Sequence, residues 1–125
     1  MAVFDPITKD EQLGIAEQTL KRIKAICPRF SLPADKSERA DLIQIWAEAL
    51  FADYVWPRTV YKKAIVIYAT TATREDNPPT PGDMIRFCIQ AVDRMESDPV
   101  EGPRLQRWRD ERMALITGRE LPPWP

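Results

Sequence analysis

Residues 80–95 read TPGDMIRFCIQAVDRM, and this stretch decides the fold class. Threonine is a residue type that caps helix N-termini, and a proline at the next position suits the first turn of a helix. Asp83 then places a negative charge on the N-terminal dipole. The apolar residues that follow recur at the 3.6-residue spacing of one helix face. The stretch therefore predicts an amphipathic α-helix over about residues 81–97.

Prolines divide the rest of the chain into further segments of helical length. All 12 fall in small clusters, and proline disrupts a helix interior but is tolerated in the first turn. Each interval between clusters shows the helical period, so we predict helices near residues 9–27, 38–52, 57–71, 81–97 and 103–117. The β-branched residues of the third interval leave a strand as an alternative there. Since no alternating run suggests a sheet, the expected fold is all-α, a compact bundle of four to five short helices.

Local signals predict the ends of these helices. Thr8 with Glu11 fits a capping box at the start of the first helix. Ser37 is the expected cap of the second, and Pro57 is expected in the first turn of the third. Gly118 is a natural C-terminal stop for the fifth helix.

The apolar stripes predict which side chains are buried. Val66 and Ile67 make the middle of the third helix apolar on more than one side, so this helix is expected to be the most buried. Trp46 lies in the stripe of the second helix and is expected in the core. Trp56 is expected to pack where the chain enters the third helix.

Composition excludes several classes of protein. The chain has 125 residues, which suits one domain, and its 44% of hydrophobic residues argues against disorder. The 18 basic and 19 acidic side chains nearly cancel, which argues against affinity based mainly on phosphate neutralisation. No apolar run is long enough for a transmembrane helix, and residues 1–6 lack the pattern of a signal peptide. We therefore expect a soluble, cytoplasmic protein.

The residue types needed for common catalytic sites are missing. There is no histidine, which removes the commonest general base and metal ligand, and the 4 glycines stand apart, so there is no phosphate-binding loop. Cys27 and Cys88 lie in amphipathic patterns and are interpreted as buried reduced thiols, with a disulfide or a reactive thiol as the alternative. We predict no enzyme, no cofactor and no metal site, and a protein that acts by binding another macromolecule.

The C-terminal part carries the predicted partner-binding site. Residues 1–98 supply four helices, enough for a helical core domain, and residues 99–125 form a helix and a proline-rich tail, part of the same domain if the helix docks. Aromatic and arginine side chains are enriched at interface hot spots. The candidates are Arg104, Arg107, Trp108, Arg112 and Trp124. The alternatives are that both tryptophans fold back over the core and that the alternating charges form a solvated face.

A second group of basic residues is divided between two helices. Its members are Lys21, Arg22, Lys24, Lys62 and Lys63. Short clusters of this kind on separate helices are usually ordinary surface. We interpret them in that way here.

The middle of the chain resembles a family of phage proteins. Three motifs carry the resemblance: Leu42-x3-Trp46-x3-Leu50, then Val60-x3-Ala64-x3-Tyr68-Ala69-Thr70, then Asn77-Pro-Pro-Thr-Pro-Gly-Asp-Met-Ile85. In this order they are similar to the phage replicative-helicase loader/inhibitor family and to the N-terminal domains of helicase-loading proteins. The similarity covers about residues 37–95.

The resemblance implies a small helical protein that loads or inhibits a DnaB-type hexameric replicative helicase during phage DNA replication, in the cytoplasm of the bacterial host. It implies the helicase as protein partner and an origin-binding protein as the trigger for delivery to DNA, with weak or no direct binding to nucleic acid and none to a membrane. In the family the helicase contact is associated with the often flexible segment after the compact part. Here residues 103–118 are predicted to be helical, which implies a helix-in-groove contact. The alternatives are a small DNA-binding or transcription-regulating protein and a phage structural or assembly protein.

Overall fold

The computed structural model describes residues 7–73, 77–118 and 121–122. Within these ranges the chain forms five α-helices and no strand, which confirms the all-α prediction and excludes a strand near residues 57–71. The helices are α1 (Lys9–Ile26), α2 (Lys36–Leu50), α3 (Arg58–Thr71), α4 (Pro81–Glu96) and α5 (Glu101–Thr117).

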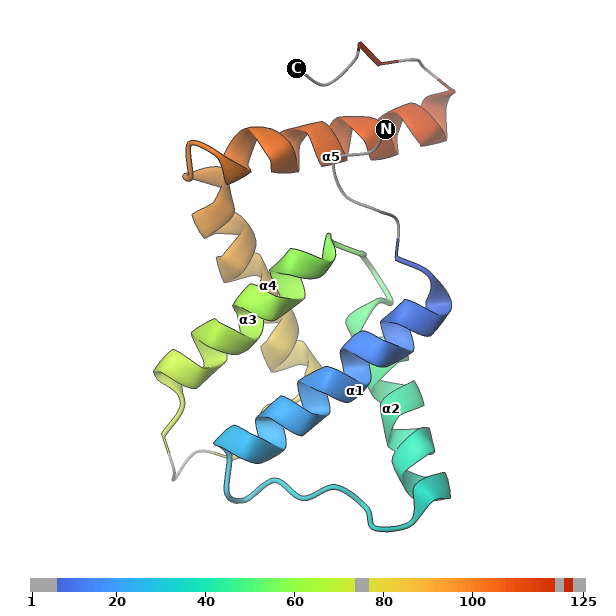
Figure 1. The fold of residues 1–125 in the computed structure, drawn as a ribbon, viewed down its shortest axis with the longest axis vertical. Helices are drawn as coiled ribbons and strands as arrows, with labels where there is room; N and C mark the ends of the chain where they lie inside the picture. Colours follow the sequence, from blue (N-terminus) through green and yellow to red (C-terminus); the bar gives the residue numbers. More distant parts are fainter. Residues whose placement is uncertain (1–6, 74–76, 119–120, 123–125) are drawn as a thin grey trace.

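The first four helices form the body of the molecule, and α5 lies across one end of it (Figure 1). α1 packs against α2 and α3, and α4 packs against α2, α3 and α5. α4 is therefore the helix of the body against which α5 packs. The largest fully buried side chains come from four different helices: Leu20, Ile23, Val60, Met84, Met95 and Leu105.

Two expectations about burial are confirmed, with one exception at Val66. Trp46 is 5% exposed and belongs to the core, as predicted from its place in the apolar stripe. α3 buries six of its 14 residues, more than any other helix, which confirms the expectation, although Val66 is 63% exposed. The exposed position follows from packing, because α1 and α4 cover the faces of α3 that carry its other apolar residues.

Three of the predicted helix ends are confirmed. The Thr8 hydroxyl accepts a hydrogen bond from the backbone N–H of Glu11 at 3.2 Å, so Thr8 caps α1 as expected, but the Glu11 carboxylate pairs with Arg58 and does not complete the capping box. At α4 the capping is reciprocal: the Asp83 N–H donates to the Thr80 hydroxyl at 3.2 Å, and the Thr80 N–H donates to the Asp83 carboxylate at 2.9 Å. Gly118 ends α5 with a positive φ of 72°.

Two other predicted helix ends are wrong. Ser37 does not cap α2, because the Asp35 carboxylate accepts the backbone N–H of Glu38 at 3.0 Å and starts the helix at Lys36. Pro57 precedes the first turn of α3 and does not lie in it, since its extended ψ of 149° places it at the cap position.

The corner between α4 and α5 is built by a carboxylate and a glycine. Asp98 accepts the backbone N–H groups of Val100 at 2.8 Å and Glu101 at 2.9 Å, which satisfies donors at the start of α5. α5 therefore begins two residues earlier than predicted. A Cβ at position 102 would lie 2.8 Å from the backbone oxygen of Glu96, so Gly102 allows the two helices to meet closely.

Candidate protein-binding surface

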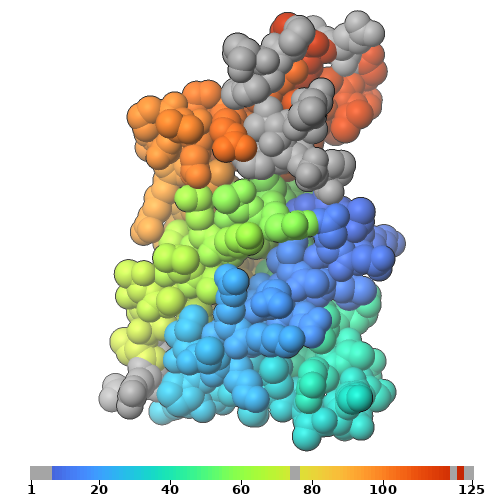
Figure 2. Space-filling view, viewed as in Figure 1, coloured from blue at the N-terminus to red at the C-terminus, as the bar shows by residue number. Residues whose placement is uncertain are grey.

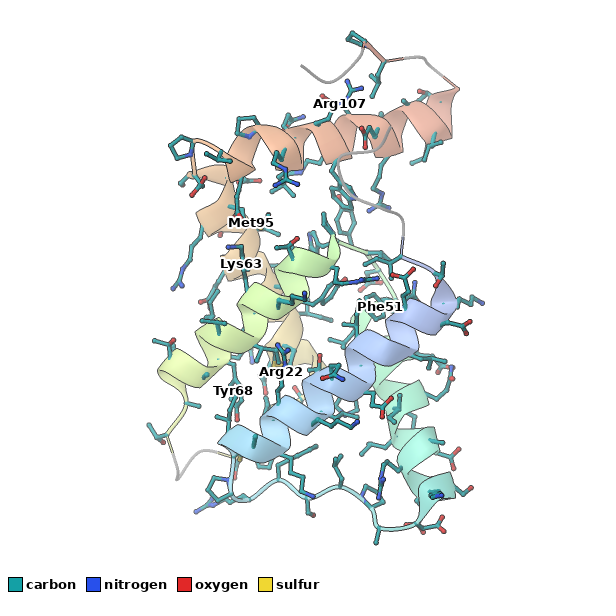
Figure 3. The ribbon with its side chains drawn as sticks, in the orientation of Figure 1. Arg22, Phe51, Lys63, Tyr68, Met95 and Arg107 are labelled. Carbon is teal, nitrogen blue, oxygen red and sulfur yellow. The ribbon has the colours of Figure 1, made fainter. Side chains whose placement is uncertain are left out.

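The first half of α5 is docked on the body. Leu105 is fully buried and Trp108 is 7% exposed, and both belong to the hydrophobic core. At the start of the helix, the Glu101 carboxylate lies 3.3 Å from the Lys63 ammonium group of α3. Figure 3 places Lys63 on the side of the body that faces α5. Burial of the two apolar side chains contributes most to docking, because exposed ion pairs stabilise little.

A cluster of side chains holds the middle of α5 against the loop between α2 and α3. The Trp108 ring meets the Tyr54 ring edge-on, with centroids 5.9 Å apart. The Arg112 guanidinium lies 4.6 Å from the Tyr54 ring centroid and 4.9 Å from that of Trp108, and it donates a hydrogen bond to the Val55 carbonyl at 2.9 Å. We call Arg112, Trp108, Tyr54 and Val55 the arginine clamp. Its cation–π contacts and its charge-assisted hydrogen bond fix α5 relative to the body.

The other predicted site residues are placed in different ways. Arg104 is exposed. Arg107 lies on α5 beside Glu111, with 3.3 Å between its Nε and the carboxylate, and neighbouring Arg109 pairs with a glutamate of α4. Trp124 lies outside the described residues. The structure therefore brings Trp108 and Arg112 together but engages most of the arginines within the protein.

Trp108 is buried and is not exposed for a partner. Its ring is covered by Tyr54 and Arg112, so it acts as an internal anchor for α5, which is the alternative in which the tryptophan folds back. No pattern within α5 signals this contact, because Arg112 and Val55 are 57 residues apart in the sequence. Tyr54 and Val55 are thus the residues of this site that sequence reasoning missed.

The end of α5 carries an exposed apolar cluster beyond the clamp. Met113 is 57% exposed, Leu115 84% and Ile116 75%. We call these three residues the apolar tip. α5 occupies one end of the molecule, opposite the end where α2 begins (Figure 2). The sequence shows the apolar residues before Gly118. Only their exposure in the structure distinguishes the apolar tip from the half of the helix that is docked on the body.

The thiols and carboxylates are the groups of the described residues that could act as nucleophiles or hold a metal ion. Cys27 and Cys88 are both buried and are not joined in a disulfide, as predicted. Burial raises the pKa of the Cys88 thiol to about 12, which keeps it protonated at neutral pH. In the described parts of the chain, no group of three Cys, Asp or Glu side chains is arranged to hold a metal ion. Nor is any helix there both long and apolar enough to cross a membrane.

Comparisons with known proteins do not place the chain in a family. No protein family, curated protein or solved structure matches it. The surface of the molecule and the motifs within residues 37–95 are therefore the available guides to function.

Proposed function

We propose that the protein is a non-enzymatic binding protein that engages another protein through the apolar tip of α5. The observation that carries the proposal is the exposure of Met113, Leu115 and Ile116, between 57% and 84%, at the end of one helix. Exposed apolar side chains scattered singly are normal, whereas three within four residues at the end of one helix are typical of an interaction surface. The other large exposed apolar side chains of the described residues lie singly on different elements.

The partner in this proposal is a DnaB-type hexameric replicative helicase, with the protein acting as its loader, its inhibitor or both in phage DNA replication. The motifs within residues 37–95 support this choice, and they lie on α2, α3, α4 and the loops between them. In the family that they resemble, the helicase contact follows the compact helical part. α5 follows that part in this chain, and the apolar tip is its exposed portion.

The docked state of α5 favours the tip as a contact. Because the arginine clamp and Leu105 already hold the helix, a partner that receives the tip does not have to order it first. Leu115 and Ile116 then enter a hydrophobic groove of the helicase as helix-borne anchors. The bound protein would hold the helicase until an origin-binding protein triggers delivery to DNA.

The arginines of α5 support a protein partner more than a nucleic acid. Arg107 has a glutamate partner on its own helix, Arg109 pairs with a glutamate of α4, and Arg112 is held in the clamp. Each guanidinium would have to leave a partner before it could neutralise a phosphate. Affinity for nucleic acid based on this helix is therefore weak.

A double substitution in the tip tests the proposal. Leu115→Ser with Ile116→Ser removes both anchors from positions that are 84% and 75% exposed, so the fold should persist. Binding to a purified DnaB-type helicase hexamer, measured by biolayer interferometry, should weaken at least tenfold, about 1.4 kcal/mol. The thermal melting curve of the double variant should overlay that of the parent protein.

The matched control replaces two exposed apolar residues elsewhere. Ile45→Ser with Val66→Ser changes side chains that are 60% and 63% exposed on α2 and α3, and helicase binding should not change. Equal loss in both variants would mean that the tip has no special role. If the parent captures a different protein from lysate and the tip variant does not, the binding surface stands and the helicase assignment fails.

A further inference from the structure

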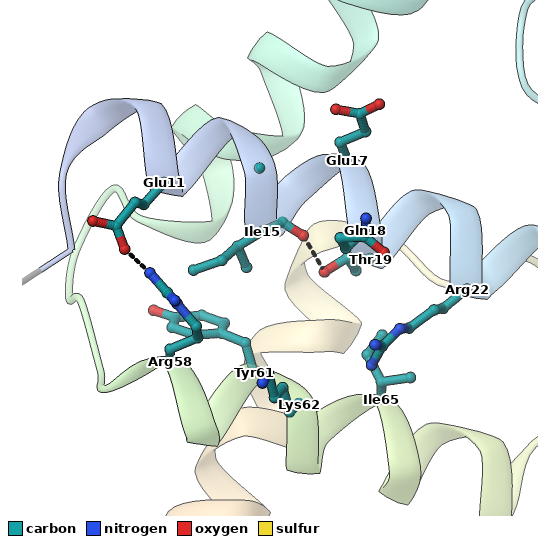
Figure 4. Close-up of a pocket in the computed structure, with 11 residues that line it drawn as sticks. Glu11, Ile15, Glu17, Gln18, Thr19, Arg22, Arg58, Tyr61, Lys62 and Ile65 are labelled. Carbon is teal, nitrogen blue, oxygen red and sulfur yellow. Dashed lines mark hydrogen bonds and ion pairs between the residues drawn. The ribbon is translucent and has the colours of Figure 1, made fainter. Parts of the chain in front are cut away.

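A groove on the face of the body lies between α1 and α3, away from the apolar tip. Its volume is about 400 Å³, and it is open to solvent (Figure 4). Side chains of both helices form its floor, with Ile15 from α1 and Tyr61 and Ile65 from α3. The floor of the groove is therefore apolar and aromatic.

Two basic side chains at this groove have no acidic partner among the described residues. Arg22 of α1 and Lys62 of α3 line the groove, and neither makes an ion pair or hydrogen bond with the residues that the structure describes. Figure 4 shows the Arg22 side chain reaching from α1 toward Ile65. These two cations belong to the basic group that sequence alone assigned to ordinary surface.

The carboxylates at the groove are already neutralised. Glu11 forms an ion pair with Arg58 across the groove, and Glu17 lies 3.1 Å from the ammonium group of Lys21. The two acids therefore do not cancel Arg22 and Lys62. The groove has a net positive character next to an apolar floor.

Gly14 lines this groove without a side chain. It lies inside α1, where a glycine costs about 1 kcal/mol relative to alanine. A Cβ built at Gly14 has no atom of the described residues within 4 Å, so packing among those residues does not require a glycine. Gly14 nevertheless lines the groove, and its missing side chain leaves the backbone of α1 open to close approach.

We propose that the groove between α1 and α3 binds an acidic amphipathic peptide segment of a protein partner. Apolar side chains of the segment pack on Ile15, Tyr61 and Ile65, and its backbone passes close to Gly14. Its carboxylates pair with Arg22 and Lys62. The mode is a helix or extended segment in a groove, separate from the contact of the apolar tip.

The observations favour a peptide over a nucleic acid. A phosphate backbone needs a longer row of cations than Arg22 and Lys62 supply at this groove. The apolar floor is suited to aliphatic side chains. The positive charge of Arg22 and Lys62 and the apolar floor of the groove together favour an acidic segment that carries leucines.

The test uses a fluorescein-labelled 15-residue peptide with leucines at helical spacing flanked by glutamates. Fluorescence anisotropy should give a Kd of about 100 µM or tighter for the full chain. The same peptide with lysines in place of glutamates should bind at least tenfold more weakly. Arg22→Glu with Lys62→Glu should weaken the acidic peptide at least tenfold, whereas Lys24→Glu, on α1 but outside the groove lining, should not.

Gly14→Leu separates binding from folding. Leucine is a strong helix former and has open space at this position, so the melting temperature should rise by roughly 4 °C. The added side chain fills the groove, so the acidic peptide should bind at least fivefold more weakly to a more stable protein. Unchanged affinity in Gly14→Leu would overturn the proposal.

Two further measurements complete the test. Leu115→Ser with Ile116→Ser should retain the acidic peptide, which keeps this proposal distinguishable from that of the apolar tip. No binding of the peptide up to 1 mM, unchanged binding after charge reversal, or competition by a 20-nucleotide single-stranded DNA would each contradict the peptide site.

Discussion

α4 and α5 are neighbouring helices of nearly equal length, 16 and 17 residues, yet they are held in different ways. α4 has a reciprocal capping box and buries five residues along its whole length: Met84, Cys88, Ala91, Val92 and Met95. α5 has no side-chain hydrogen bond from its cap residue and buries Leu105 and Trp108 near its middle. Its second half carries Arg112 of the arginine clamp and then the apolar tip.

The difference shows how a helix can belong to a core and still present an apolar surface. A continuous stripe such as that of α4 leaves no part of the apolar face available, because each turn packs against the body. α5 concentrates its docking in one turn and in the guanidinium of Arg112. The residues after that point keep their helical form without being covered.

The largest effect is expected from a change in the buried stripe of α4. Met84→Ala should lower the free energy of unfolding by about 2–5 kcal/mol, because Met84 is 2% exposed and its removal leaves a cavity. Urea denaturation followed by circular dichroism measures this loss. Ile89→Ala is the control on the same helix, since Ile89 is 47% exposed, and its change should stay under about 0.5 kcal/mol. If Met84→Ala lowers the free energy of unfolding only slightly, the buried stripe does not hold α4 as described, and the contrast with α5 fails.

A smaller effect is expected from the arginine clamp. Arg112→Ala removes two cation–π contacts and the hydrogen bond to Val55, and should cost about 1–2 kcal/mol. Hydrogen exchange should rise in α5 more than in α4, because the clamp holds only α5. Arg94→Ala on the exposed face of α4 is the charge-matched control. Equal exchange in both helices after Arg112→Ala would show that the clamp does not hold α5 by itself.

The smallest expected effect is a loss of stability at low pH, which comes from the aspartates at the starts of α4 and α5. The backbone N–H groups of Glu101 and Val100 hold the pKa of Asp98 below its usual value, and the Thr80 N–H, followed by Arg86, lowers that of Asp83. A lowered folded-state pKa contributes stability above the unfolded pKa of about 3.9, and this contribution is lost as pH falls through the folded value.

Thermal melts between pH 7 and pH 2 should therefore show falling stability at the acid end. Asp98→Asn should flatten part of that dependence and increase hydrogen exchange at the start of α5, while α4 stays unaffected. Asp83→Asn should do the reverse. If neither variant alters the acid limb of the pH profile, other carboxylates control it.

The helices were predictable because local chemistry determines them. Prolines, caps and apolar spacing predicted all five helices, and the errors at Ser37, Pro57 and the start of α5 are shifts of one or two residues. At α2 and α5 an aspartate just outside the expected range accepts backbone N–H groups and extends the helix. Several residue types can cap, so the sequence did not determine which one does.

The candidate site was less predictable because it depends on contacts across the chain. Trp108 beside arginines is typical of an exposed hot spot, but the Tyr54 ring that covers it belongs to a distant loop. The groove likewise needs α1 and α3 to lie side by side before Arg22 and Lys62 share one surface. Residue types alone therefore pointed to Trp108 as a surface residue, whereas the structure buries it.

The two buried thiols can report how often the structure around them opens. Cys27 is 2% exposed at the end of α1, and Cys88 is 1% exposed in the middle of α4. A thiol reagent such as Ellman's reagent can reach either sulfur only when the surrounding structure opens, so the rate of labelling reports how often each region does so. Cys27 lies at the end of α1 and Cys88 lies in α4. The labelling rates of the two cysteines therefore report the opening of these two regions separately, and no cysteine has to be introduced.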